Sequence, residues 1–481
     1  MGTARSHRNR FRGVRDRALT GASPRELRKA TGVRALRSAY LKHVANSSAV
    51  GRDGVRPQDL EVDWDATATL LQRKLRSGAY RFSPYRRVLL LKGEGKPPRA
   101  LSIPNARDRV ALRAVLNALI DAIDYAGREL PQAMASRFIR AWESDPTRDF
   151  VRIDLIAYYD SIDHDHLTAA LRQKVRSRRL RELVMAAVKT GSALRGAPRP
   201  AHPNRRGVPQ GMALSNILGD VFLESFDLEF ERRSEVEFFR YVDDVIALCP
   251  AGSAVKIFGD MRSLLEGLGL EVHEPGPNGK SSTGSVSEEF EFLGYRFHDK
   301  VVGVRKASVR RLEDSLIRAI VDYRYQLSRP PSGTDALEWS ETCARRLQWK
   351  LDLLVTGCRF EESRRGWLPY FLCITDLSEL ARLDRVLNGM LRRRKIPDSV
   401  RPKSFMRAYW AWNAGPRSKR RDYIPNFDGI TTTRKRKMLI DLLGVPPSVV
   451  SDWTKTVVDA EFSRRMGWLV RQMERDIGSP S

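Results

Sequence analysis

Apolar residues recur along the chain with two different periods, one typical of helices and one typical of strands. Helical spacing predicts helices at 64–75 (closed by Gly78), 107–123, 165–175 (capped by Asp163), 212–232 and 255–268. Runs of β-branched and aromatic residues predict strands at 86–91, 101–104, 150–155 and 290–297, and a hairpin of two strands at 238–248. Beyond residue 305 the pattern is mostly helical, starting with a helix that Ser308 could cap. The sequence therefore predicts an α+β core followed by a helical region.

The run 238–248 places two adjacent carboxylates, Asp243 and Asp244, between two apolar stretches, which is the pattern of a tight β-hairpin. Hairpin tips favour Asn-Gly or Asp-Gly, and neighbouring carboxylates repel each other unless a positive group lies between them. A divalent metal ion would supply that charge, because hard cations bind carboxylate oxygens. An exposed acidic turn without a metal explains these two residues equally well.

The net charge of the chain indicates which kind of molecule it binds. The chain has 481 residues, with 85 Lys and Arg against 58 Asp and Glu, which gives a formal net charge of +27. A folded protein this basic usually binds a polyanion, most often nucleic acid. An anionic membrane surface is the rival, but no apolar run approaches the ~18 residues of a spanning helix. Four widely spaced cysteines argue against a zinc finger and indicate reduced thiols, so we expect a cytoplasmic protein.

Basic residues gather near both ends. Residues 1–40 hold eleven Arg and Lys against two acids, which predicts a phosphate-contacting arm or a solvated tail. Residues 391–437 hold fifteen Arg and Lys interleaved with aromatic residues, a pattern suited to phosphate contact and base stacking. A solvated basic face over a small aromatic core is the alternative. The candidate nucleic-acid-binding residues are Lys96, Arg392, Arg393, Arg394, Lys403, Arg407, Arg420, Arg421, Arg434 and Lys435.

A third carboxylate, Asp154, lies at the end of the strand predicted at 150–155. A strand-end acid and a hairpin-tip pair can converge on one edge of a sheet, where they would hold two divalent ions ~3.5–4 Å apart. Such ions activate a 3′-hydroxyl and stabilise the leaving pyrophosphate, so the chemistry would be nucleotidyl transfer. Lys92 and Arg99 lie in a predicted hairpin whose cations suit phosphate binding.

These motifs follow an order that resembles the reverse transcriptases, over roughly residues 54–297. Tyr241-Val-Asp-Asp244 resembles their palm signature, and residues 151–164 resemble the first metal-binding motif of bacterial and group II intron-type enzymes. Gly207-Val-Pro-Gln-Gly211 resembles the motif beside the incoming nucleotide and template base. Residues 291–295 resemble the primer grip, and residues 366–384 resemble the helical thumb of intron-type enzymes.

The resemblance implies a role for each matched residue. The implied metal site is Asp154, Leu155, Asp243 and Asp244, holding two Mg²⁺ ions, with Mn²⁺ as an alternative. The implied nucleotide site is Lys92 and Arg99 on the triphosphate, with help from Lys96, Tyr159 as the steric gate against a 2′-hydroxyl, and Gln210 and Gly211 lining the pocket. Lys280 aligns with a lysine that would protonate the leaving pyrophosphate. The implied catalytic set is therefore Asp154, Asp243, Asp244 and Lys280.

Some residues depart from the intron-type pattern. Met134-Ala-Ser-Arg137-Phe138 stands in place of a Phe-Arg-Pro-Gly-Arg-Ser-like stretch, and Ser215-Asn216 stands in place of Ser-Pro. No His-Asn-His endonuclease motif follows the thumb. In these respects the chain is similar to domesticated bacterial reverse transcriptases of phage-defence systems.

We therefore predict a right-hand polymerase fold of α+β class. The expected domains are a basic arm (1–50), fingers and palm (51–304), a helical thumb (305–397) and a basic RNA-binding region (398–481). The expected function is RNA-templated DNA synthesis on a structured non-coding RNA in antiphage defence, with dNTPs as substrates and a DNA product. A second copy of the chain or a second protein from the same operon is a further candidate partner, and a membrane is not. The alternatives are a group II intron maturase or mobile-element enzyme, and a catalytically silent RNA-binding scaffold.

Overall fold

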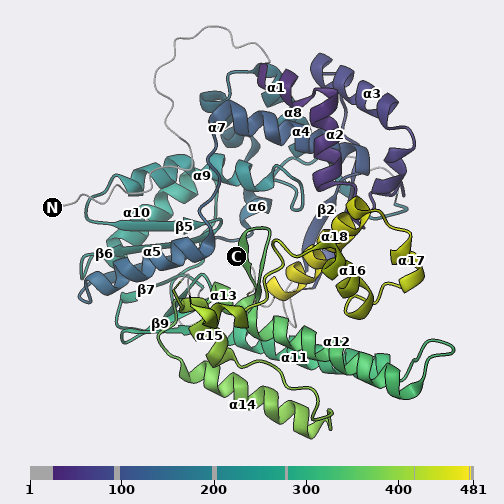
Figure 1. Cartoon of the computed structure of the whole chain (residues 1–481). Coiled ribbons are helices and arrows are strands. Elements are labelled where there is room, and N and C mark those ends of the chain that lie inside the picture. Colours follow the sequence, from purple (N-terminus) through teal and green to yellow (C-terminus); the bar gives the residue numbers. More distant parts are fainter. Residues whose placement is uncertain are drawn as a thin grey trace. The chain divides into compact units, whose positions relative to one another are not determined.

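The computed structural model describes residues 25–91, 98–197, 203–276, 280–415, 418–475 and 477. The chain divides into two compact units, of which the first comprises Met1–Leu130 and Asp149–Gly284. The second comprises Pro131–Arg148 and Ser285–Ser481. The labels below follow Figure 1.

The described elements of the first unit are helices and short strands. They are α1 (Arg25–Ala30), α2 (Val33–His43), η1 (Pro57–Glu61), α3 (Trp64–Ser77), β1 (Tyr85–Leu90), β2 (Arg99–Ile103), α4 (Ala106–Ile123), β3 (Asp149–Asp154), α6 (Tyr158–Ser161), α7 (His164–Lys174), α8 (Arg178–Val188), β4 (Ser192–Ala193), α9 (Ser215–Glu231), β5 (Glu237–Tyr241), β6 (Asp244–Cys249) and α10 (Ala254–Gly267). Strand β7 (Ser282–Ser285) follows, and the boundary of the unit falls within it, after Gly284.

A four-stranded sheet in the order β5-β6-β3-β7 positions the acidic residues. Strand β6 is antiparallel to both β5 and β3, and its residues 245–249 are all buried. Helix α9 contacts β5 and helix α10 contacts β3. Most residues of α9 between Ile217 and Phe230 are buried, and the buried residues include two aspartates, Asp220 and Asp227.

A second, three-stranded sheet has the order β2-β1-β4. Strands β1 and β2 form the predicted hairpin, with Leu90 opposite Arg99. The residues between them include Lys92 and Lys96, which lie outside the described part of the chain. Strand β4 pairs with β1 through Tyr85 and Ser192.

The second unit combines a small antiparallel sheet with helices. Its elements are α5 (Pro131–Ser144), β8 (Phe290–Phe292), β9 (Tyr295–His298), β10 (Val301–Val304), α11 (Lys306–Leu327), α12 (Ala336–Thr356), β11 (Cys358–Phe360), β12 (Ser363–Arg365), α13 (Trp367–Tyr370), α14 (Ser378–Arg393), α15 (Phe405–Asn413), η2 (Lys419–Tyr423), α16 (Thr432–Asp441), α17 (Pro447–Ser451) and α18 (Lys455–Glu474). The long helices α11 and α12 pack against each other, side by side in Figure 1.

The clearest local signals in the sequence are confirmed. Helix α3 ends at Gly78, whose φ of 75° is the left-handed conformation expected of a glycine C-cap. Helix α7 begins after Asp163, whose side chain accepts hydrogen bonds from the backbone N–H groups of Asp165 and His166.

Three local predictions are wrong. The segment predicted as one strand at 290–297 is the hairpin β8–β9, because Leu293 and Gly294 both take positive φ, 49° and 83°, as a tight primed turn requires. The acidic tip is shifted by one residue, since Tyr241 pairs with Asp244 and the turn is therefore Val242-Asp243. Ser308 does not cap α11; it lies inside that helix, and its hydroxyl donates to the carbonyl of Ile477.

The two compact units divide the chain differently from the four predicted functional domains, which remain predictions. Helix α5 belongs with the second unit because Phe138 packs on Phe292 and Phe297 at ring-centroid distances of 5.0 and 5.1 Å. The mixed helix and antiparallel-sheet architecture agrees with the predicted α+β class. Among the described helices, none is long and apolar enough to cross a membrane.

Candidate functional site

Two of the three predicted aspartates are direct neighbours on adjacent strands. The antiparallel register of β3 and β6 places Asp154 opposite Asp244. Directly opposed residues share one face of a sheet and have Cβ atoms about 4.5–5.5 Å apart. Asp243 precedes Asp244 in the turn between β5 and β6. The sheet therefore brings the acid at the end of β3 next to the pair of acids in the hairpin, as predicted.

The turn that carries Asp243 has an unusual backbone. Val242 is buried and has a φ of 62°, a conformation that costs free energy for a β-branched residue. Its carbonyl accepts a 2.7 Å hydrogen bond from Nη1 of Arg240, which is itself fully buried. This hydrogen bond helps to hold the turn in a conformation that valine would otherwise avoid.

Basic side chains lie beside the two opposed carboxylates. Lys280 Nζ lies 3.6 Å and His273 Nε2 3.4 Å from Oδ2 of Asp154. Arg152 Nε lies 3.7 Å from Oδ1 of Asp244. Like charges directly opposed on a strand pair destabilise it, and the positive charges of Lys280 and Arg152 offset that repulsion. Lys280 is one of the residues predicted for this site, whereas His273 and Arg152 were not predicted.

A signal for one of the missed residues was present. Arg152 stands two residues before Asp154 on the same strand, so the two-residue period of a strand puts both side chains on one face. His273 follows the bridge between Leu155 and Val272, and its backbone N–H donates to the Asp154 carbonyl over 3.1 Å. Nothing local in the sequence marks that contact.

The carboxylates predicted to hold a metal ion lie beside basic side chains in this structure. In the part of the chain that the structure describes, no group of three or more His, Cys, Asp and Glu side chains is arranged to hold a metal ion. Asp154 and Asp244 point instead toward the cations named above. The chemistry of the two carboxylates nevertheless fits a divalent cation, because such ions prefer hard oxygen donors. Their position fits as well, because Asp154 and Asp244 lie opposite each other on neighbouring strands.

Two consecutive tyrosines lie beside the end of β3. Tyr158 donates a 2.7 Å hydrogen bond to the Gly219 carbonyl, and Tyr159 donates a 3.0 Å bond to Oδ1 of Asn216. A Cβ on Gly219 would come within 3.4 Å of both rings, so a larger residue would crowd both tyrosines. Burial raises the pKa of Tyr159, which keeps its hydroxyl neutral and able to donate. Asn216, noted in the sequence as a departure, is thus the partner of the predicted steric gate.

The loop from Gly207 to Gly211 connects this turn with the β1–β2 sheet. Val208 N–H donates to the Tyr159 carbonyl over 2.7 Å, and Ser102 N–H donates to the Gln210 carbonyl over 2.7 Å. Gly207 has a φ of 81°, and a Cβ there would lie 2.7 Å from the Asp160 carbonyl oxygen. The loop therefore needs glycine at its start in order to approach the tyrosine turn.

A cavity of about 240 Å³ lies along this loop. Gln210 lines it, together with Arg87, Ser102, Asp160 and Arg206. Gly211 follows with a φ of 95°, and a Cβ on it would lie 3.1 Å from the Ser102 carbonyl oxygen. Arg99 begins β2, the strand that also supplies Ser102.

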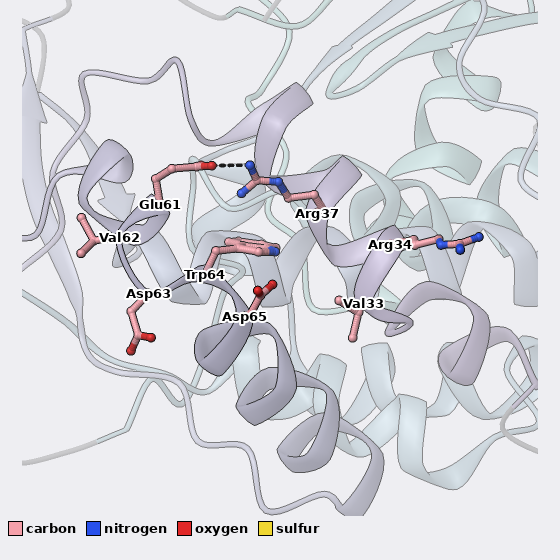
Figure 2. Close-up of a pocket in the computed structure, with 8 residues that line it drawn as sticks. All are labelled: Val33, Arg34, Arg37, Glu61, Val62, Asp63, Trp64 and Asp65. Carbon is pink, nitrogen blue, oxygen red and sulfur yellow. Dashed lines mark hydrogen bonds and ion pairs between the residues drawn. The ribbon is translucent and has the colours of Figure 1, made fainter.

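A larger open cavity of about 650 Å³ lies among α2, η1 and α3. Figure 2 shows Arg37 reaching Glu61 across this cavity. Arg34 and Arg37 line it together with Glu61, Asp63 and Asp65, so opposite charges are mixed around its rim. That balance gives no reason to assign a charged ligand to it.

The residues of the C-terminal region that were predicted to bind nucleic acid differ in their contacts. Lys403 donates to the Tyr423 carbonyl over 2.6 Å, Arg421 donates to the Ala414 carbonyl over 3.1 Å, and Lys435 pairs with Asp459 at 2.8 Å. These contacts hold local structure. Three other predicted residues are exposed, namely Arg392 and Arg393 at the end of α14 and Arg434 on α16. Arg394, which follows α14, is partly exposed. Arg407 and Arg420 line a cavity with Trp410.

The sheet, its opposed aspartates, the buried tyrosine turn and the glycine loop define the palm of a nucleotide-polymerising enzyme. Residues 91–297 match the family described as "Reverse transcriptase (RNA-dependent DNA polymerase)". The chain therefore carries a reverse transcriptase domain, which confirms the predicted right-hand polymerase fold and the predicted class of enzyme, an RNA-directed DNA polymerase.

Several proteins are similar to part of the chain. Protein YkfC of Escherichia coli is 28% identical over 295 residues, which cover 51% of this chain and 75% of YkfC. The group II intron-encoded protein LtrA of Lactococcus lactis subsp. cremoris is 26% identical over 34% of this chain and 29% of LtrA. An uncharacterized 91 kDa protein in the cob intron of Schizosaccharomyces pombe is 28% identical over 42% of this chain and 25% of that protein.

A solved structure of apo telomerase from Candida tropicalis, truncated from the C-terminal domain, is also similar. It is 15% identical, with a TM-score of 0.36, over 47% of this chain and 55% of the telomerase chain. The chain thus spans from a quarter to three quarters of the length of the curated relatives named above.

Proposed function

We propose that the chain is an RNA-templated DNA polymerase that copies an associated structured non-coding RNA in a bacterial antiphage defence system. The observation that carries the catalytic part is the register that sets Asp154 opposite Asp244, with Asp243 beside them, inside the reverse transcriptase domain. The net charge of +27 supports a nucleic-acid partner. The defence role rests on the departures from the intron-type pattern at Ser215-Asn216 and Met134–Phe138.

Asp154, Asp243 and Asp244, with Leu155 beside them, would hold the two Mg²⁺ ions, or Mn²⁺ in their place. When bound, the ions activate the 3′-hydroxyl of the primer and stabilise the leaving pyrophosphate. Lys280 and His273 now contact Asp154, and Lys280 is more than half exposed. Lys280 can therefore leave the carboxylate when a cation replaces it and donate a proton to the pyrophosphate.

The nucleotide would lie along the glycine loop. Gln210 and Gly211 border its base, and Arg99, with Lys92 and Lys96, would hold the triphosphate through charge-assisted hydrogen bonds. Tyr159 is half-buried and fixed by Asn216, so its ring forms a rigid wall suited to excluding a 2′-hydroxyl. Positioning of the substrates and electrostatic stabilisation then provide most of the rate enhancement.

A second candidate function is that of an intron-type maturase or mobile-element reverse transcriptase. The similarity to LtrA, an intron-encoded protein, favours it. It shares the polymerase core and differs in its RNA, which would be an intron that surrounds the gene. Sequencing of the RNA that co-purifies with the protein distinguishes these two functions.

The first experiment is DNA synthesis by protein purified from its own operon with its bound RNA. The protein receives Mg²⁺ and each dNTP singly and together, beside the variants Asp154→Asn and Asp243→Asn. Each variant is expected to lose synthesis by about 10²–10³-fold or more, the loss that follows removal of one electrostatic stabiliser of a transition state. Chelation of Mg²⁺ should abolish synthesis by the unmodified protein.

Asp149→Asn is the matched control. Asp149 begins the same strand, opposite Cys249, and accepts a hydrogen bond from Gly252 N–H over 2.7 Å that asparagine can also accept. This variant should synthesise DNA as the unmodified protein does. Full synthesis by Asp243→Asn would contradict the metal assignment, and bound RNA without any product, also on an added primer and template, would favour the scaffold function.

A further inference from the structure

The second unit has a cavity of about 700 Å³ at its surface. It lies between helix α15 and the turn η2, both beyond the part of the chain that matches the reverse transcriptase family. Its lining is Arg407, Trp410, Ala411, Lys419, Arg420 and Tyr423. Three cations and two aromatic rings therefore surround one space, and none of the described residues that line it carries a carboxylate.

Packing of the hydrophobic core does not explain why Trp410 lines this cavity. The side chain of Trp412 on the same helix is buried, and its Nε1 donates a 2.7 Å hydrogen bond to the Thr356 carbonyl. Residues two positions apart point to different sides of a helix, and Trp410 remains 49% exposed. Its flat apolar face is thus available to a ligand, whereas that of Trp412 is used by the fold.

The cations of the cavity are available as well. In the part of the chain that the structure describes, no carboxylate forms an ion pair with Arg407, Lys419 or Arg420. Arg407 lies over the Tyr423 ring at 5.3 Å, on which Lys403 also lies, at 4.9 Å. The Tyr423 ring is therefore covered by Arg407 and Lys403. Of the two aromatic rings in the lining, Trp410 is the one on which a base could stack. Lys419 and Arg420 begin η2 and are exposed at the mouth of the cavity.

We propose that this cavity binds an unpaired nucleotide of single-stranded RNA, whose base stacks on Trp410 and whose flanking phosphates contact Lys419, Arg420 and Arg407. An aromatic face bordered by cations matches the two separable parts of an unpaired nucleotide, a flat base and an anionic backbone. Bases inside a duplex are already stacked on each other and cannot lie on the ring. The proposal rests on the proposed RNA-templated function for the source of the strand, and it assigns the site to single-stranded stretches of that RNA.

The test measures binding of the full chain to a fluorescently labelled single-stranded RNA. Trp410→Ala should weaken binding by roughly 5- to 150-fold, the effect of losing one base–aromatic stack, while Trp410→Phe should retain most of the affinity. Trp468→Ala on α18 is the matched control, because Trp468 is likewise exposed, at 59%, and lies outside this cavity. It should bind as the unmodified protein does.

The phosphate contacts have their own readout. When Lys419 and Arg420 are both replaced by Gln, the slope of log affinity against log salt should fall in magnitude by about 1.4, since each contact to a single strand contributes about 0.7. Lys455→Gln, at an exposed lysine of the same unit, should change the slope much less. A blunt RNA duplex of the same length should show no dependence on Trp410.

Equal losses in Trp410→Ala and Trp468→Ala, or equal dependence of duplex binding on Trp410, would overturn the proposal. Tighter Trp410-dependent binding of single-stranded DNA than of RNA would overturn the RNA assignment, and equal competition by polyglutamate would overturn the nucleotide assignment. Failure of the proposed function is a separate result. In that case the unmodified protein would not extend an annealed primer on an added template, although Trp410-dependent binding persisted.

Discussion

At the scale of single residues, the acidic turn depends on a buried ion-pair network. The side chain of Arg240 is fully buried; it forms an ion pair with Asp227 and lies 3.6 Å from Asp220. Asp220 in turn accepts hydrogen bonds of 2.7 Å from Arg128 and 2.5 Å from Tyr125. Burial by itself would lower the pKa of Arg240, but the two carboxylates raise it above its usual value, so the guanidinium stays charged.

Arg240 is therefore predicted to position the turn that carries Asp243. Arg240→Met removes the donor to the Val242 carbonyl and leaves Asp227 as an uncompensated buried charge, which costs about 3–5 kcal/mol of stability. We expect lower thermal stability and lower DNA synthesis. Thermal unfolding and the rate of dNTP incorporation measure the two effects separately.

A double variant separates positioning from stability. In Arg240→Met combined with Asp227→Leu both charges are absent, so most of the lost stability should return. Synthesis should stay low, because nothing then donates to the Val242 carbonyl. Recovery of both stability and synthesis would show that Arg240 has only a structural role.

The sequence predicted some residues of the site but not their partners. Asp154, Asp243 and Asp244 stand in short local patterns, so their convergence was predictable. The partners that surround them were not, because Asp227 and Asp220 come from helix α9, and His273 reaches Asp154 from a segment more than a hundred residues later. Only tertiary structure brings these residues together.

At the scale of elements, boundaries set by a local signal were predictable and boundaries set by unusual backbone were not. Gly78 and Asp163 mark the end of α3 and the start of α7 through contacts within one helical turn. The β8–β9 turn places Leu293 at a φ of 49°, where sequence patterns expect Asn or Asp. The acidic turn likewise uses Val242, so the sequence placed its tip one residue too late.

The cap of α7 yields a pH-dependent prediction. Hydrogen bonds from the backbone N–H groups of His166 and Asp165 lower the pKa of Asp163. Because the folded-state pKa is depressed, this stabilisation is fully present above the ordinary carboxyl pKa and is lost as the pH falls through the folded-state value. Asp163→Ala should cost about 1 kcal/mol at pH 7 and progressively less below about pH 4.

Asp163→Asn serves as the comparison, because asparagine caps helices through a neutral oxygen. Thermal unfolding of the three proteins between pH 3 and pH 7 measures the difference. The Asn and Ala variants should differ by a constant amount over this range, whereas the gap between the unmodified protein and Ala should narrow in acid. A gap that stays constant would contradict the charged cap.

At the scale of the whole chain, the second compact unit is discontinuous in sequence. Helix α5 packs its Phe138 against Phe292 and Phe297, and Trp142 donates a 3.0 Å hydrogen bond to the Val286 carbonyl. The four-stranded sheet β5-β6-β3-β7 of the first unit lies between α5 and these partners in sequence. No change of composition marks such an insertion, which is why domain boundaries drawn along the sequence could not reveal it.

This packing predicts how fragments of the chain fold. A fragment of residues 285–481 exposes the apolar rings of Phe290, Phe292 and Phe297, so we expect it to bind a hydrophobic dye and to lack a cooperative thermal transition. Residues 131–148 joined to Ser285 by a short linker should restore cooperative unfolding, because Val286 N–H donates to the Arg148 carbonyl over 3.1 Å and the two ends already lie together. Phe138→Ala in that fusion should cost about 3–5 kcal/mol. Cooperative unfolding of residues 285–481 alone, at the temperature of the fusion, would show that α5 is dispensable to the unit.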